Sequence, residues 1–139
     1  MKKIRIICLM LSLSAILCLF SGCARKEEKK SVLTVESVVA FADSARDVGL
    51  SYFSKYDYVQ LGSNERPLYY FQLNDPDFSL SVGIDEDGAI ESMLFSHISG
   101  EEIYIFHKNP GQLDPNATQY TEDASSYDLQ NFIDKMTEN

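Results

Sequence analysis

The sequence predicts an α+β fold: an N-terminal helix packed on an antiparallel meander of four to five strands, followed by a short C-terminal helix. Three observations predict it. Apolar residues recur at helical spacing in the segment after Thr34. Five runs rich in aromatic and β-branched residues follow, each bounded by residues typical of turns. A second stretch with helical spacing then ends the chain.

The first helix is expected to begin after Thr34, whose hydroxyl can accept a hydrogen bond from a backbone N–H of the first turn. The residues on its expected apolar face are Val35, Val38, Val39, Ala42, Ala45 and Gly49. Gly49 followed by Leu50 is typical of a helix that stops at a left-handed glycine. We therefore expect the helix to run as far as Gly49.

The five strands are expected at residues 56–61, 68–73, 78–84, 89–97 and 102–107. Short turns separate them, and connections of this length join neighbouring antiparallel strands. A long polar loop is expected at 108–123 and a helix after Ser125 or Ser126. The apolar stripe of that helix would comprise Leu129, Phe132, Ile133 and Met136.

The N-terminus has the organisation of an export signal. Residues 1–5 are mostly basic, and an apolar run of 15 residues extends from Ile6 to Phe20. A transmembrane helix needs about 20 apolar residues, whereas a secretory signal combines a basic start, a shorter apolar run and a small-residue cleavage site. An uncleaved anchor is the alternative.

The segment Leu19-Phe20-Ser21-Gly22-Cys23 resembles the lipobox of bacterial lipoproteins. The resemblance implies that diacylglycerol is attached to the thiol of Cys23 and that residues 1–22 are removed as a signal peptide. Residues 23–32 would then be the lipidated cysteine and a charged tether, and 33–139 a single small α+β domain. An ordinary secretory signal, with Cys23 present by chance, is the other interpretation.

The lipobox resemblance implies a location at the cell membrane, lipid-anchored on the extracytoplasmic face. Cys8 and Cys18 lie within the signal, so no cysteine pair remains for a disulfide, although an exported chain could form one. The domain must then be stable through its core alone.

From Ser31 to Asn139 the chain carries five basic and 19 acidic side chains, a net charge of −14. A nucleic-acid-binding protein has the opposite balance. The excess of carboxylates favours a basic partner, or simply keeps the domain soluble.

One face of the sheet is the candidate binding surface. Apolar side chains alternate with small ones in residues 78–84, and aromatic side chains flank the small ones. The residues expected on this face are Tyr70, Ser79, Ser81, Gly83, Met93, Phe95 and Tyr104. They would form a shallow groove that binds a peptide or protein. The alternative is that the C-terminal helix covers this face and completes a three-layer core.

Motifs for catalysis or metal binding are weak. Asp85-Glu86-Asp87-Gly88 resembles part of a calcium-binding loop but lacks two ligands, and a hairpin turn explains it better. His97 and His107 are ten residues apart with no further convergent ligands, so no zinc site is expected. The single mature cysteine is assigned to lipid, and no nucleophile motif is present. We therefore predict neither an enzyme nor a cofactor.

A helix followed by a meander containing Ser81-Val82-Gly83-Ile84-Asp85-Glu86-Asp87-Gly88-Ala89-Ile90 resembles the small PepSY or cystatin-like domains. This resemblance implies binding or inhibition. The predicted function is an exported, lipid-anchored protein whose acidic domain binds a protein or peptide near the membrane. Two alternatives are an immunity or inhibitor lipoprotein directed at a basic toxin or hydrolase, and a cell-envelope enzyme or accessory subunit.

Overall fold

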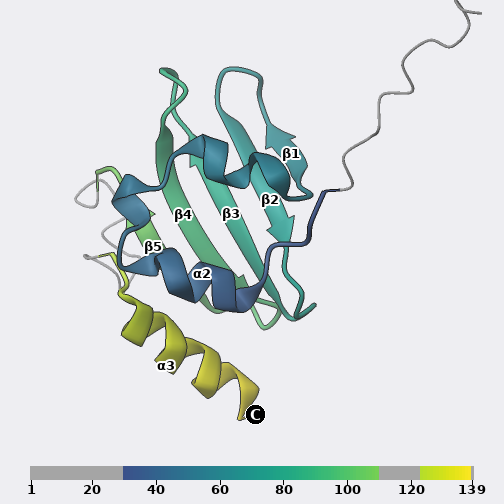
Figure 1. Ribbon diagram of the computed structural model, residues 1–139, viewed down its shortest axis with the longest axis vertical. Helices are drawn as coiled ribbons and strands as arrows, with labels where there is room; N and C mark the ends of the chain where they lie inside the picture. Colours follow the sequence, from purple (N-terminus) through teal and green to yellow (C-terminus); the bar gives the residue numbers. More distant parts are fainter. Residues whose placement is uncertain (1–29, 110–122, 139) are drawn as a thin grey trace, which may run out of the picture.

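The computed structural model describes residues 30–109 and 123–138 (Figure 1). Helix α2 is followed by two 3-10 helices, five strands and helix α3. Their bounds are α2 Val35–Ala42, η1 Ala45–Asp47, η2 Leu50–Lys55, β1 Val59–Gly62, β2 Pro67–Gln72, β3 Phe78–Ile84, β4 Ile90–His97, β5 Glu102–His107 and α3 Ser126–Thr137. The predicted α+β class is confirmed.

The strands form one sheet in the order β1-β2-β3-β4-β5, and every neighbouring pair is antiparallel. This is the meander that the short turns predict. Gly62, Gly88 and Gly100 have positive φ angles of 77°, 81° and 92°. Gly88 and Gly100 lie in hairpin turns, where a residue without a Cβ adopts such angles at little cost.

Helix α2 begins where the sequence predicts, because the Thr34 hydroxyl accepts a hydrogen bond of 3.1 Å from the backbone N–H of Ser37. The prediction that the helix continues to Gly49 is wrong. Ser44 bonds back to the carbonyl of Phe41 through both its backbone N–H and its hydroxyl, which competes with further helical turns. Gly49 is extended, with φ −86°, and precedes η2.

The helices pack on one face of the sheet (Figure 1). The ring of Phe53 in η2 lies 5.3 Å from that of Phe71 in β2, and Phe132 in α3 lies 6.0 Å from Phe95 in β4. The apolar stripe of α3 therefore enters the same core as α2. The alternative in which the C-terminal helix covers the opposite face of the sheet is wrong.

Hydrogen bonds join the N-terminus of α3 to the end of α2. Ser125 and Asp128 form a reciprocal capping box at the start of α3. The Asp43 carboxylate, just after α2, accepts hydrogen bonds from the backbone N–H and the hydroxyl of Ser126, at 2.7 and 2.6 Å. These bonds lower the pKa of Asp43, the one from the Ser126 hydroxyl most, and those from Ser125 lower the pKa of Asp128.

Adjacent residues in β2 test the assignment of the two faces. Phe71 is 1 % exposed in the core, whereas Tyr70 is partly exposed on the opposite face. We expect Phe71→Ala to lower the free energy of unfolding by about 3–5 kcal/mol, because it leaves a cavity. Tyr70→Ser should cost less than about 1 kcal/mol. Urea titration measures both, and a similar loss in the two variants would contradict the assignment.

The helix junction should be sensitive to acid. Because the folded-state pKa of Asp43 and of Asp128 lies below the ordinary value of 3.8, each contribution to stability is complete above that value. It is lost as the pH falls through the lower folded-state pKa. The urea midpoints of the wild type and of Asp43→Asn/Asp128→Asn should therefore differ at pH 7, and the difference should shrink as the pH falls through the folded-state pKa values of the two carboxyl groups. A constant difference across this range would contradict the role of these carboxylates.

Candidate ligand-binding surfaces

The sheet face opposite the helices is named here the open face. Tyr70 pairs with Ser81, Ser81 with Leu94, and Leu94 with Tyr104 across β2 to β5. Residues that pair directly across antiparallel strands project from the same face. Val59, which pairs with Tyr70, extends this central row to β1 and is 57 % exposed.

Of the predicted face residues, Tyr70, Ser79, Ser81, Gly83 and Tyr104 project from the open face. The prediction that Met93 and Phe95 belong to it is wrong. Phe95 pairs with Leu80 and Met93 with Val82, so both enter the core, where each is 0 % exposed. Leu94 takes their place on the open face. Its neighbours in sequence are equally apolar, so alternation alone left the orientation of β4 ambiguous.

Gly83 has a structural reason to be small. A Cβ at this position would lie 2.7 Å from the Ser92 hydroxyl and 4.0 Å from a methyl carbon of Leu68. Neighbouring side chains thus fill the space beside the glycine. At this end of the open face the paired row comprises Leu61, Leu68, Gly83, Ser92 and His107.

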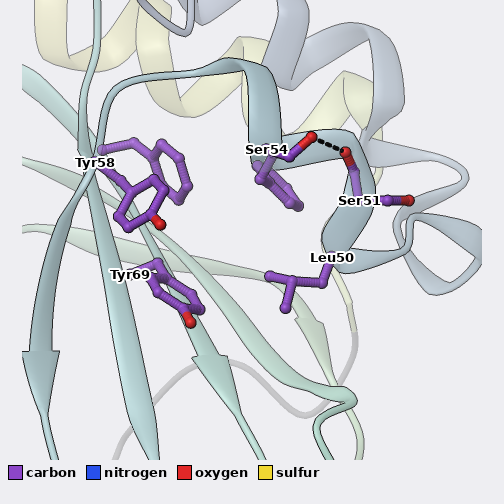
Figure 2. Close-up of a pocket in the computed structure, with 7 residues that line it drawn as sticks. Leu50, Ser51, Ser54, Tyr58 and Tyr69 are labelled. Carbon is purple, nitrogen blue, oxygen red and sulfur yellow. Dashed lines mark hydrogen bonds between the residues drawn. The ribbon is translucent and has the colours of Figure 1, made fainter. Parts of the chain in front are cut away.

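A second surface lies on the helical side of the sheet, at a cavity of about 310 Å³ between η2 and strand β2. It is named here the η2 cavity (Figure 2). Its lining is mainly apolar and aromatic, and comprises Leu50, Ser51, Phe53, Ser54, Tyr58, Tyr69 and Phe71. Tyr58 and Tyr69 stand on the sheet side, opposite Leu50 and Ser51 of η2 (Figure 2).

Ring contacts fix the sheet-side wall of the η2 cavity. The ring centroids of Tyr58 and Tyr69 are 4.9 Å apart at an angle of 73°, and Tyr58 also contacts Phe71 at 5.9 Å. Edge-on contacts of this kind hold aromatic side chains in defined orientations. On the helical side, the Ser54 hydroxyl donates to the carbonyl of Ser51 at 2.8 Å, which occupies its proton (Figure 2).

Cations border the tyrosine cluster near the η2 cavity. The Lys30 ammonium lies 4.2 Å from the ring centroid of Tyr58, and that of Lys55 lies 4.8 and 5.0 Å from the rings of Tyr52 and Tyr56. Burial, with the hydrogen bond and charge of Tyr56, raises the pKa of Tyr52 to about 12. Burial also acts to raise the pKa of Tyr56, but hydrogen bonds with Tyr52 and Lys55 outweigh it and lower that pKa.

Three other cations of the described chain are paired with carboxylates. Arg46 pairs with Asp123, Arg66 with Glu86, and Lys108 with Asp85, each at 2.7 Å. No carboxylate lies within ion-pair distance of Lys30 or Lys55 among the described residues. Lys30 and Lys55, which lie over the rings of Tyr52, Tyr56 and Tyr58, are therefore outside these ion pairs, and the two lysines are named here the cationic corner.

The η2 cavity was not predicted from the sequence. Its helical wall is a 3-10 turn whose six residues, Leu50–Lys55, lack the longer periodicity that identifies an amphipathic helix. The concentration of Tyr52, Phe53, Tyr56 and Tyr58 in one short segment was the available signal. That concentration does not distinguish the wall of a cavity from a filled core, because aromatic residues are common in both.

The acidic turn at 85–88 forms the expected hairpin. The Asp85 carboxylate accepts hydrogen bonds from the backbone N–H groups of Asp87 and Ala89, and from Lys108 at 2.7 Å. The bond from Lys108, followed by that from Ala89, lowers the pKa of Asp85. These partners occupy the oxygens that a cation would need.

His97 and His107 lie at opposite ends of the β4–β5 hairpin. His97 pairs with Phe78 next to the turn, whereas His107 pairs with Ser92. Within residues 30–109 and 123–138, no three His, Cys, Asp or Glu side chains converge as metal ligands would. The same residues contain no buried side-chain nitrogen or oxygen that lacks a hydrogen-bond partner.

Comparison with protein-family models, curated proteins and solved structures finds no match to this chain. Cys23 and the rest of the lipobox lie outside the described residues. None of the helices in the described part of the chain is both long enough and apolar enough to cross a bilayer.

Proposed function

We propose that this chain is an extracytoplasmic lipoprotein, anchored by lipid on Cys23, whose acidic domain binds a protein or peptide partner through the open face. The observation that carries the proposal is the central row of Val59, Tyr70, Ser81, Leu94 and Tyr104 across all five strands. A sheet buries one face against its helices and leaves the other to water or to a partner. Here the row is largely apolar and aromatic, with Val59 exposed and the other four residues partly exposed.

The composition of the open face supports a protein partner. Interfaces combine an apolar, aromatic centre with a polar border. The central row has two tyrosines and Leu94, and the neighbouring row joins Gln72, Ser79, Ser96 and Glu102. Tyrosine contributes apolar contact area together with a hydroxyl that can bond to the partner.

The charge of the domain supports a basic partner. With a net charge of −14 from Ser31 onward, the domain attracts cationic proteins and speeds their association. A basic toxin or hydrolase, inhibited at the membrane, is the particular form of this function that the charge favours. Binding should then weaken as salt screens the charges.

The lipid anchor is tested by replacing Cys23. We expect the wild-type chain to fractionate with membranes and Cys23→Ala to be released from them, because two or more acyl chains give durable anchoring. Intact mass of the mature protein reads the lipid directly. A wild-type chain that lacks added lipid, or that stays in solution, would contradict the proposal.

The open face is tested by photocrosslinking in the producing cells. A photoreactive amino acid placed at Leu94 should yield an adduct of one defined mass, and Tyr70→Ser should reduce its amount. The same photoreactive group at Tyr127, which is 73 % exposed on α3, is the matched control. Equal adducts from both positions, or none from position 94, would exclude the open face as the partner site.

A further inference from the structure

The η2 cavity has the features of a small-molecule site that is separate from the open face. Its volume of about 310 Å³ lies near the lower end of the range of about 300–1,000 Å³ for such sites. Tyr69 and Phe71 line it from the core side of β2, whereas Tyr70 between them projects from the open face. A ligand in the cavity and a partner on the open face would therefore contact opposite sides of the sheet.

The lining determines which part of a ligand can enter. Leu50, Phe53, Tyr58, Tyr69 and Phe71 supply mostly carbon surface, and the Ser54 proton is already used by the Ser51 carbonyl. A buried charge or polar group without a hydrogen-bond partner would be costly there. The volume accommodates one apolar chain rather than the paired chains of a phospholipid.

The cations beside the cavity determine the other end of the ligand. Lys30 lies over the ring of Tyr58, which forms one wall of the cavity, and Lys55 follows the wall residue Ser54. No carboxylate of the described residues pairs with either ammonium. In a domain with 14 excess negative charges, this local cationic corner is complementary to an anionic head group outside the apolar cavity.

The position in the chain indicates where such a ligand would come from. Lys30 follows Cys23 by seven residues, a separation that can span at most about 25 Å. If Cys23 carries lipid, as in the proposed function, the cavity is close to the bilayer, where single-chain amphiphiles concentrate.

From this combination we infer that the η2 cavity binds a fatty acid, with the acyl chain between Leu50 and the Tyr58–Tyr69 pair and the carboxylate beside Lys30. The ligand class rests in part on the proposed lipid anchor. The apolar lining and the adjacent cations are independent of it.

The test uses the full lipidated chain in membranes of the producing cells and two diazirine-bearing probes, dodecanoate and dodecanol. After irradiation, the labelled peptides are mapped. We expect dodecanoate to label the peptides that contain residues 50–58 and 69–71. Leu50→Trp, which fills the cavity from a position already 36 % exposed, should abolish this labelling.

Three controls make the result specific. Leu61→Trp introduces the same ring at a residue that is 45 % exposed on β1 and outside the cavity lining, and should leave labelling unchanged. Thermal unfolding of both Trp variants verifies that they fold. Lys30→Gln should reduce dodecanoate labelling about two- to fivefold, the effect of one partly exposed ion pair, without changing dodecanol labelling.

Several results would overturn the inference. These are equal labelling by dodecanoate and dodecanol in the wild type, labelling that persists in Leu50→Trp, and labelling confined to peptides outside the cavity. Labelling that occurs only in Cys23→Ala would assign the cavity to the chain's own acyl group instead. Membrane fractionation of the same samples measures the lipid anchor separately. A wrong assignment of the anchor can therefore be distinguished from a wrong assignment of the cavity.

Discussion

The domain depends on one apolar layer, in which a five-stranded sheet and all of its described helices share a single buried face. One ring contact, between Phe53 and Phe71, joins the 3-10 helix η2 to the sheet, and another, between Phe132 and Phe95, joins the C-terminal helix to it. Residues 30–109 and 123–138 contain no cysteine, so no disulfide joins them and this layer must offset the entropy of ordering the chain. Because the described helices all pack on one side of the sheet, none of them covers the other side.

The elements with strong local signals were predicted from the sequence and those set by register were not. Strand β3 alternates strictly between core residues and Ser79, Ser81 or Gly83, so both its bounds and its faces could be assigned. Strand β4 is apolar in both phases, and only its pairing with Leu80 and Val82 places Met93 and Phe95 in the core. A bulge shifts the register of the β4–β5 pairing. Tyr104 and Phe106 are two residues apart and would ordinarily share a face, but Tyr104 lies on the open face, whereas Phe106 pairs with Met93 and packs against the core. The alternation of apolar and polar residues along a strand does not reveal such an inserted residue.

Tertiary contacts explain why the junction between the two helices and the η2 cavity were not predicted. Thr34 and Ser125 act as caps through bonds to residues three positions away, which a sequence pattern reveals. Asp43 instead bonds to Ser126, 83 residues later, and no local rule predicts a bond between residues so far apart in the sequence. The chain then turns through η1 and η2, and the η2 cavity exists only because η2 crosses over β2 at this point. Its lining is therefore a property of the fold and not of any one segment.

The charge distribution gives the two surfaces different surroundings. The domain as a whole is strongly acidic, so an anionic bilayer repels it. Lys30 and Lys55, in contrast, lie close to the N-terminal end of the described residues. Under the proposed anchor, electrostatics would favour orientations with this cationic corner toward the membrane and the acidic remainder away from it. Since Tyr69 and Tyr70 project from opposite sides of β2, the same strand would then present the cavity and the open face to different neighbours. Substitutions at the two surfaces that share no contacts should have nearly additive effects on stability, which allows each surface to be altered without the other.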